Sequence, residues 1–282
     1  MIEISVIVPT YKPQDYLWEC LGSLKNQTFP WSQFEIIIVL NGCDEPYKGN
    51  IETYISNNMA GMNVKFIHTM QGGVSNARNI ALDAAEGEYV TFIDDDDHVS
   101  PGFLEELYNK SSQDTIALCY PYAFYDGDDR QMEYPLTRLY DKISVHGKQK
   151  YNNARKYFSG SCMKLIPMSV IRDRRFDTQF RNGEDCLYMF FISDKFRYVD
   201  FTSPKAIYYR RYRADSAVTA GRSKYELLAN GMKMMLGYTR MYLCHIGSYS
   251  FMFYLTRMLG AVKNILDWER RQFLSRRHGT GS

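Results

Sequence analysis

The sequence predicts an α/β protein with a mostly parallel sheet flanked by helices, followed by a helical extension at the C-terminus. Over the first hundred residues, short apolar and β-branched runs alternate with helical patterns, which is typical of a parallel sheet covered on both faces. From residue 220 onward the apolar residues recur at helical spacing instead. We therefore expect a domain over residues 1–219, with halves at about 1–113 and 114–219, and an extension over 220–282.

The first half contains four candidate strands and three candidate helices. Leu17, Leu21 and Leu24 share one helical face, and Pro101 opens a short helix that runs to Tyr108. Between them, Ser75 is a candidate N-cap and Gly87 a candidate stop for a helix over 74–85. The apolar runs that predict strands are Ile4–Pro9, Phe34–Leu40, Val64–Thr69 and Tyr89–Ile93.

The alternation of strand and helix patterns is less regular in the second half of the domain. Residues 116–124 predict a strand, and the polar, turn-rich residues 126–147 are interpreted as a surface excursion. A helix is expected over 184–193, with strands over 197–200 and 206–212.

Charge and cysteine usage exclude several classes of protein. The chain has 34 Lys and Arg against 32 Asp and Glu, a net charge of +2, so no overall field points to a nucleic-acid partner. The charge is uneven, however, because residues 220–282 hold ten Lys and Arg against three Asp and Glu. Six scattered cysteines without a C-x-x-C pair argue against zinc or a disulfide scaffold and suit a reducing compartment.

Neither a signal peptide nor an uninterrupted apolar run of membrane-spanning length is visible in the sequence. We expect a cytoplasmic protein, with peripheral contact at the inner face of a membrane as a further option. The apolar and basic C-terminal segment has three uses that stay open at this point: packing against the domain, binding anionic lipid, or forming a homodimer contact.

Unusual residues follow the expected strands. In an open parallel sheet, ligands bind beyond the carboxyl ends of the strands. Thr10 and Tyr11 follow the first run, Asn41 follows the second, and Asp94-Asp95-Asp96-Asp97 follows the fourth. Crowded carboxylates need a compensating cation, and Mg²⁺ and Mn²⁺ prefer oxygen ligands supplied partly by substrate phosphates. The alternative to a metal site is a solvated acidic loop.

G-x-G-x-x-G after a strand and the P-loop motif are both absent, which argues against NAD, FAD and P-loop nucleotide binding.

At this point the chain resembles family 2 glycosyltransferases of the GT-A fold. The matching text is ISVIVPTYKPQDYLWECLGSLKNQTF, EIIIVLNGCDE, GGVSNARNIALDAAEGEYVTFIDDDDHVSPGFLEEL, KLIPMSVIRDRRFDTQFRNGEDCLYMF and YYRRYRADSAV. The order and spacing of these five segments agree with the family over most of residues 1–219.

The resemblance implies roles for individual residues. Asp94 and Asp96 form the D-x-D pair, with Asp96 on a Mg²⁺ or Mn²⁺ ion and Asp94 on the ribose or the waters of the metal. Asp185 matches the general base, and Arg211 and Ser216 match a closing motif near the leaving diphosphate. The residues implied in binding the nucleotide-sugar donor are Pro9, Thr10, Tyr11, Asn41, Arg78, Asp94, Asp95 and Arg211.

One departure concerns the base of the donor. Many relatives have two acids after the second strand, where this chain has Leu40-Asn41, and an amide both donates and accepts hydrogen bonds. We expect a UDP-sugar first, with dTDP or GDP as alternatives.

The function expected from these residues is metal-dependent, inverting transfer of a sugar to an acceptor hydroxyl, on a saccharide or lipid-linked acceptor in polysaccharide or glycolipid assembly. A metal stabilises the departing diphosphate, and a carboxylate accepts the proton of the hydroxyl. For Asp185 the competing interpretation is an ordinary first-turn acid of a helix that Asn182 caps. Two other functions remain: an aspartyl-nucleophile phosphohydrolase, since Asp95-x-Asp97-x-Val99 follows a strand, and a nucleotide-sugar-binding protein without catalysis.

Overall fold

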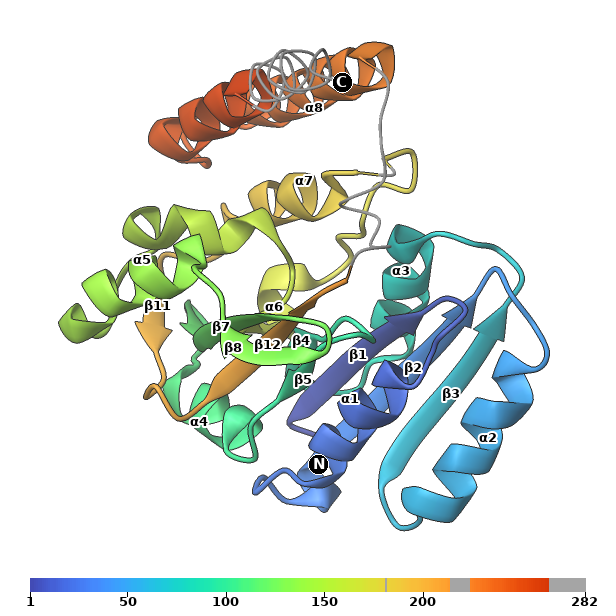
Figure 1. Ribbon diagram of the computed structural model, residues 1–282. Helices are drawn as coiled ribbons and strands as arrows, with labels where there is room; N and C mark the ends of the chain where they lie inside the picture. Colours follow the sequence, from blue (N-terminus) through green and yellow to red (C-terminus); the bar gives the residue numbers. More distant parts are fainter. Residues whose placement is uncertain (181, 214–223, 264–282) are drawn as a thin grey trace, which may run out of the picture. The chain divides into compact units, whose positions relative to one another are not determined.

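The computed structural model describes residues 1–180, 182–213 and 224–263, which belong to two compact units. The first unit is Met1–Arg213 and the second is Ala214–Ser282. The boundary expected between residues 219 and 220 falls within 214–223, outside the described residues. The first unit contains an eight-stranded sheet in the order β3-β2-β1-β4-β10-β6-β11-β9 and a four-stranded sheet in the order β5-β12-β7-β8 (Figure 1).

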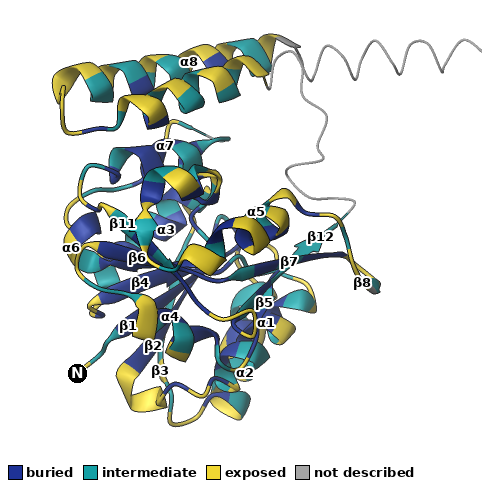
Figure 2. Cartoon of the chain, turned by 90° about the vertical axis from the view of Figure 1, so that its left-hand side faces the viewer, coloured by how far each residue is buried: buried dark blue, intermediate teal, exposed yellow. Residues whose placement is uncertain are grey.

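The N-terminal half of the first unit alternates strands and helices as the sequence predicts. Strands β1 to β4 are parallel, and β1, β2 and β4 are buried at every position because helices cover both faces (Figure 2). Right-handed crossovers place α1 and α2 on one face and α3 on the other. The elements are β1 (Ile4–Thr10), α1 (Tyr16–Lys25), η1 (Trp31–Gln33), β2 (Phe34–Asn41), α2 (Tyr47–Asn58), β3 (Asn63–Thr69), α3 (Val74–Ala84) and β4 (Tyr89–Phe92).

The second half completes the large sheet and adds the small one. Strand β10 is antiparallel to both of its neighbours, β4 and β6, so the sheet is mixed where the two halves join. The elements are β5 (His98–Val99), α4 (Phe103–Lys110), β6 (Thr115–Leu118), β7 (Tyr120–Tyr125), β8 (Asp128–Gln131), α5 (Pro135–Ile143), η2 (Ser144–His146), β9 (Gln149–Lys150), η3 (Tyr151–Ser159), β10 (Lys164–Pro167), α6 (Met168–Ile171), α7 (Glu184–Phe191), β11 (Tyr198–Phe201) and β12 (Ile207–Tyr212).

Two expectations for this half are wrong. The single strand expected over 116–124 is two strands in different sheets, separated at Cys119, whose N–H donates to the Met163 carbonyl oxygen. The excursion expected over 126–147 contains β8 and α5 instead. Although this segment is polar overall, Thr137, Tyr140 and Ile143 recur every third residue and are buried on one face of α5. This spacing of buried residues explains why the segment forms a helix although its composition is polar.

Glycine, rather than a polar side chain, precedes the two helices that border the site. The N-cap positions of α3 and α7 are Gly73 and Gly183, with φ of 116° and 81°, and neither cap makes a side-chain hydrogen bond. The N-caps expected at Ser75 and Asn182 are therefore wrong. Gly87 lies beyond the end of α3, and a Cβ there would stand 2.5 Å from the Ser5 backbone nitrogen, so strand β1 leaves no space for a side chain.

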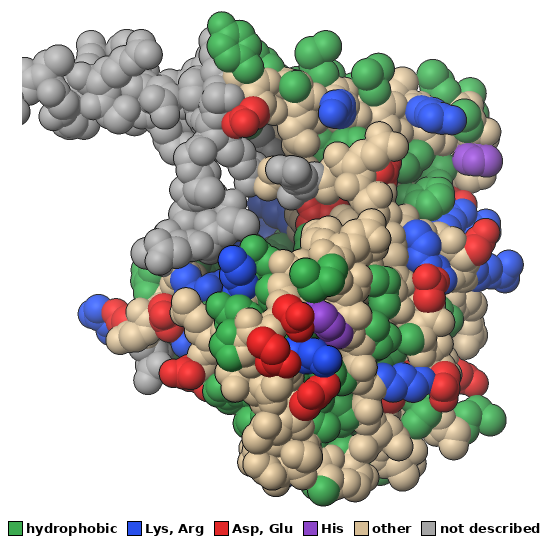
Figure 3. Space-filling model, turned by 90° about the vertical axis from the view of Figure 1, so that its right-hand side faces the viewer, with side chains coloured by type: hydrophobic (Ala, Val, Ile, Leu, Met, Phe, Trp, Pro, Cys, Tyr) green, Lys and Arg blue, Asp and Glu red, His purple; other side chains and the backbone are tan. Residues whose placement is uncertain are grey.

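The second unit contains helix α8 (Lys224–Cys244) and a second helical segment over residues 251–263. The rings of Tyr242 and Tyr254 stack with centroids 4.6 Å apart and join the two. Large apolar side chains stay exposed at helical spacing, namely Met232, Leu236, Leu243, Phe251, Leu255 and Leu259. Lys and Arg side chains stand among them (Figure 3). In the part of the chain that the structure describes, no helix is long and apolar enough to cross a membrane. Arg270, Arg271, Arg276 and Arg277 lie outside that part.

Candidate active site

The carboxyl ends of β1 and β2 are tied to the start of α3 through the side chain of Asn41. Its amide nitrogen donates to the Thr10 carbonyl oxygen at 2.8 Å, and its oxygen accepts from the Gly73 N–H at 2.8 Å. Asn41 is only 3% exposed, so its amide holds the loops together rather than facing solvent. The adjacent Gly42 has a φ of 66°, and a Cβ there would lie 2.9 Å from the Gly72 Cα, so the two loops touch through glycine.

Tyr11 and Pro9 differ in their exposure at this edge of the sheet. Pro9 is buried within β1, whereas the Tyr11 ring is 53% exposed and lies beside Gly42. An exposed aromatic ring at the end of a strand offers a flat surface on which a nucleotide base can stack.

The four aspartates after β4 divide by alternation into an inner pair and an outer pair. Asp95 accepts a hydrogen bond from the Thr10 hydroxyl at 2.5 Å, and burial raises the pKa of its carboxyl to about 7. Asp97 is 4% exposed and accepts from the Arg211 backbone N–H at 2.8 Å, and burial raises its pKa well above the usual range. The outer carboxylates, Asp94 and Asp96, are 44% and 17% exposed. The alternation is one of contacts: Asp95 and Asp97 accept hydrogen bonds from Thr10 and Arg211, whereas Asp94 and Asp96 form ion pairs with Arg78 and Arg213.

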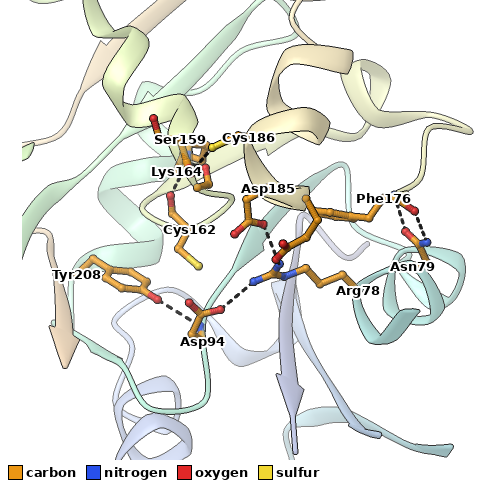
Figure 4. Close-up of polar contacts among 12 residues, drawn as sticks. Arg78, Asn79, Asp94, Ser159, Cys162, Lys164, Phe176, Asp185, Cys186 and Tyr208 are labelled. Carbon is orange, nitrogen blue, oxygen red and sulfur yellow. Dashed lines mark hydrogen bonds and ion pairs between the residues drawn. The ribbon is translucent and has the colours of Figure 1, made fainter. Parts of the chain in front are cut away.

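Arg78 lies at the centre of the site. From α3 its guanidinium donates to Asp94 Oδ1 at 3.0 Å and to Asp185 Oδ1 at 2.7 Å (Figure 4). Glu184 Oε1 lies 3.5 Å from the same guanidinium, and burial raises the pKa of the Glu184 carboxyl. The Arg78 side chain is only 3% exposed. It does not face solvent, and its positive charge is held among these acids.

Asp185 lies in the first turn of α7, with 25% of its side chain exposed. It lines a cavity of about 150 Å³ whose wall also includes Asp94. The acid expected on the donor side and the acid expected as the base therefore face one cavity and share one arginine.

The three arginines of β12 and its end have different partners. Arg211 donates to the Asp96 carbonyl oxygen at 3.0 Å and to Asp126 Oδ1 at 2.7 Å, and its guanidinium also pairs with Glu19. Arg213 donates to Asp96 Oδ2 through Nε at 2.9 Å and Nη2 at 2.8 Å. Arg211 and Arg213 thus share a face of the strand, as alternation predicts, whereas Arg210 lines the cavity.

Sequence reasoning placed Arg211 in the site but not Arg213, the cation that pairs with the Asp96 carboxylate. It also missed Tyr208, whose hydroxyl accepts the Asp94 N–H at 3.2 Å. The only sequence feature that bears on them is the alternation of side chains along a strand, which places Tyr208 and Arg210 on one face but does not identify their partners. Ser216 lies outside the described residues.

Among residues 1–180, 182–213 and 224–263, no three His, Cys, Asp or Glu side chains converge in a ready-made metal cluster. If Asp94 and Asp96 bind an ion, they would do so as two carboxylates, with no third ligand of these types among the described residues. That donor set fits an ion that takes one or two carboxylates and completes its coordination with substrate phosphates and water.

Together the fold and site define an α/β protein whose acidic strand end and cavity meet at the carboxyl edge of the sheet. Residues 5–175, more than half of the chain, match the family model for Glycosyl transferase family 2, and the chain belongs to this family.

Three relatives illustrate the range of the family. The minor teichoic acid biosynthesis protein GgaB of Bacillus subtilis is 31% identical over 221 residues, which are 76% of this chain and 23% of GgaB. The poly(ribitol-phosphate) β-N-acetylglucosaminyltransferase TarS of Staphylococcus aureus is 38% identical over 106 residues, which are 38% of this chain and 18% of TarS. The GalNAc(5)-diNAcBac-PP-undecaprenol β-1,3-glucosyltransferase of Campylobacter jejuni is 29% identical, over 84% of this chain and 72% of the relative.

The fold is shared with a solved structure. The crystal structure of S. aureus TarS residues 1–349 in complex with UDP-GlcNAc superposes with a TM-score of 0.67 at 23% identity, covering 86% of this chain and 67% of that chain. This likeness confirms the GT-A fold, with helices following the sheet domain. The matched segments cover 23% of the length of GgaB and 18% of the length of TarS, so this chain corresponds to only part of each.

Proposed function

We propose that this protein transfers a sugar from a nucleotide-diphosphate sugar to an acceptor hydroxyl, with a divalent metal ion and with inversion at the anomeric carbon. The observation that carries the proposal is the bridge from Asp94 through Arg78 to Asp185 on the wall of one cavity. It brings a D-x-D acid and a candidate base within reach of the same small ligand.

The donor binds at the carboxyl edge in this proposal. The exposed Tyr11 ring takes the base, and the loops that Asn41 holds together border it. Asn41 supports the loops of this site rather than contacting the base, because its amide nitrogen and oxygen both form hydrogen bonds within the protein. A UDP-sugar is the first candidate, supported by the shared fold with a protein solved with UDP-GlcNAc.

Mg²⁺ or Mn²⁺ is the proposed cofactor, with Asp96 as ligand and Asp94 at the ribose or at waters of the ion. When bound, such an ion neutralises the charge that grows on the departing diphosphate. Arg213 is the counter-ion of the Asp96 carboxylate and contacts it through Oδ2, so Oδ1 is the oxygen that would hold an ion. Arg211, with its donors on Glu19, Asp126 and the Asp96 carbonyl, instead supports the turn that carries the aspartates.

Asp185 is the proposed base. Its carboxylate faces the cavity, where it is in position to accept the proton of an acceptor hydroxyl, and Arg78 fixes its orientation. Direct displacement by the acceptor hydroxyl on the face opposite the diphosphate inverts the anomeric carbon, with no covalent intermediate.

A saccharide or lipid-linked acceptor in polysaccharide or glycolipid assembly is proposed from the relatives, whose names include a teichoic acid protein and an undecaprenol-linked glucosyltransferase. The second unit supports a peripheral membrane contact. Met232, Leu236 and Leu243 are exposed along one face of α8, with Lys233 and Arg240 exposed on the same helix. An apolar stripe with basic residues beside it is typical of a helix that lies on an anionic bilayer.

A thermal-shift panel tests the donor directly. Nucleotides and nucleotide sugars are added to the full chain with Mn²⁺ or with EDTA, because a ligand that binds the native state raises its melting temperature. We expect one nucleotide diphosphate to stabilise the protein only with the metal. Assays of sugar transfer and of p-nitrophenyl phosphate hydrolysis then separate the proposal from its rivals. Binding without turnover indicates a catalytically inactive binder, and phosphate release indicates the phosphohydrolase.

A further inference from the structure

Two cations line the cavity together with Asp94, Asp97 and Asp185. They are Arg210, from β12, and Lys156, from η3. Within the described part of the chain, neither side chain forms an ion pair, whereas Arg78, Arg174, Arg211 and Arg213 all do. Lys156 is exposed, whereas Arg210 is half-buried, and a half-buried guanidinium that faces a cavity without an ion pair suits an anion from outside.

Arg210 is held in a fixed orientation. Its Nη1 donates to the Tyr134 hydroxyl at 2.9 Å, and its guanidinium lies 5.7 Å and 5.1 Å from the ring centres of Tyr134 and Tyr212. The buried carboxylate of Asp97 also acts on this guanidinium, but it already accepts from the Arg211 N–H. The remaining N–H groups of a guanidinium form a planar fork that suits the oxygens of a phosphate.

A third group in the cavity wall also lacks a partner. The Ser161 hydroxyl is fully buried and, among the described residues, has no hydrogen-bond partner. The loop over residues 160–162 is held by Lys164, whose buried ammonium donates to the carbonyl oxygens of Gly160 and Cys162 at 2.7 and 2.5 Å. A buried hydroxyl without a partner destabilises the protein, and a bound ligand oxygen removes that cost.

We propose that the acceptor carries a phosphate close to its reacting hydroxyl, and that Arg210 and Lys156 bind this phosphate. The inference rests on the proposed function, because it takes Asp185 as the base. The acceptor hydroxyl then lies at Asp185, and the rest of the acceptor occupies the cavity that Arg210, Lys156 and Ser161 line. The donor diphosphate is the other source of phosphate oxygens, but the donor is assigned to the Asp94–Asp96 edge.

The experiment measures the binding of ribitol 5-phosphate and of neutral ribitol to the full chain by NMR titration, with and without saturating UDP and Mn²⁺. UDP fills the diphosphate position, so only an acceptor-side phosphate still binds in its presence. The variants are Lys156→Gln and Arg210→Lys, which keeps the charge but loses the fork. Lys150→Gln is the matched control, since Lys150 is an exposed lysine of the neighbouring β9 that does not line the cavity. Thermal melting verifies that each variant folds.

We expect ribitol 5-phosphate to bind the UDP-loaded protein at least about tenfold more tightly than ribitol, with an affinity that falls as salt rises. Lys156→Gln and Arg210→Lys should each remove most of this difference, and Lys150→Gln should preserve it. Equal binding of the two probes, a phosphate preference that UDP abolishes, or one that survives both cavity variants overturns the proposal. Failure of UDP itself to bind contradicts the proposed donor instead, and the titrations without UDP still measure the phosphate preference.

Discussion

Arg78 donates hydrogen bonds to both Asp94 and Asp185, at 3.0 and 2.7 Å, and so joins the end of strand β4 to the start of helix α7. These two acids are 91 positions apart in the sequence. A single buried guanidinium on α3 thereby sets the distance between the donor side of the site and the candidate base.

Replacing Arg78 with Gln should destabilise the protein and weaken donor binding. Removing one partner from a buried ionic group typically costs about 3–5 kcal/mol, because the carboxylates that remain lose their counter-ion. Chemical denaturation and nucleotide titration measure the two effects. Arg175→Gln is the control, since Arg175 forms a more exposed ion pair with Asp83, of a kind worth about 0–1 kcal/mol. Equal losses in the two variants contradict a central role for Arg78.

Asp185→Asn should retain donor binding and lose transfer. The amide preserves the shape of the side chain but cannot accept the proton, so turnover should fall on the order of a hundredfold or more. Nucleotide affinity and transfer rate are measured on the same preparation. A variant that transfers sugar at a near wild-type rate shows that Asp185 is only a first-turn acid of α7 and that the base lies elsewhere.

Asp95→Asn should stabilise the protein by an amount that grows with pH. The carboxyl pKa is raised from 3.8 to about 7 by burial, so the folded state retains a proton in that range that the unfolded state releases. The contribution of this group to stability is therefore full at low pH and is lost as pH rises from about 4 to 7. Because Asn stays neutral, the melting temperature of the variant relative to wild type should increase between about pH 5 and pH 8. A difference that stays constant over this range contradicts the raised pKa.

Leu236→Glu should reduce binding to anionic vesicles. Leu236 is 68% exposed on the apolar face of α8, where a carboxylate opposes both insertion and attraction to anionic lipid. Co-sedimentation at low and high salt measures the effect, with Val145→Glu as control because Val145 is 77% exposed in the first unit. The membrane contact is ruled out if the wild-type protein stays in the supernatant at low salt or pellets equally with neutral lipid.

The parts of the fold that were predictable are those whose apolar pattern is local. Strands β1, β2 and β4 appear as largely continuous apolar runs, because helices cover both faces of the sheet. Strand β10 has only four residues, including a buried Lys164 and Pro167, and its partners β4 and β6 lie far away along the chain. Its pairing depends on tertiary contacts that no local pattern contains.

The site divides in the same way. Asp94, Asp96, Arg78 and Asp185 were identified through motif resemblance, and the structure brings Asp94 and Asp185 together on Arg78. The partners of the β12 arginines were not predictable, because alternation assigns faces but not contacts. Only the folded chain shows that Arg213 pairs with Asp96 and that Arg210 faces the cavity.

Calorimetric titration of UDP into wild-type protein and Asp96→Ala, each with Mn²⁺ and with EDTA, tests the central claim most directly. If the strand end binds a metal–nucleotide complex, UDP should bind wild-type protein with Mn²⁺ and should lose most of its affinity in EDTA. Asp96→Ala should lose the same affinity while Mn²⁺ is present, because the proposed ligand of the ion is gone. Equal UDP affinity in all four titrations would contradict a metal-dependent donor site at these aspartates.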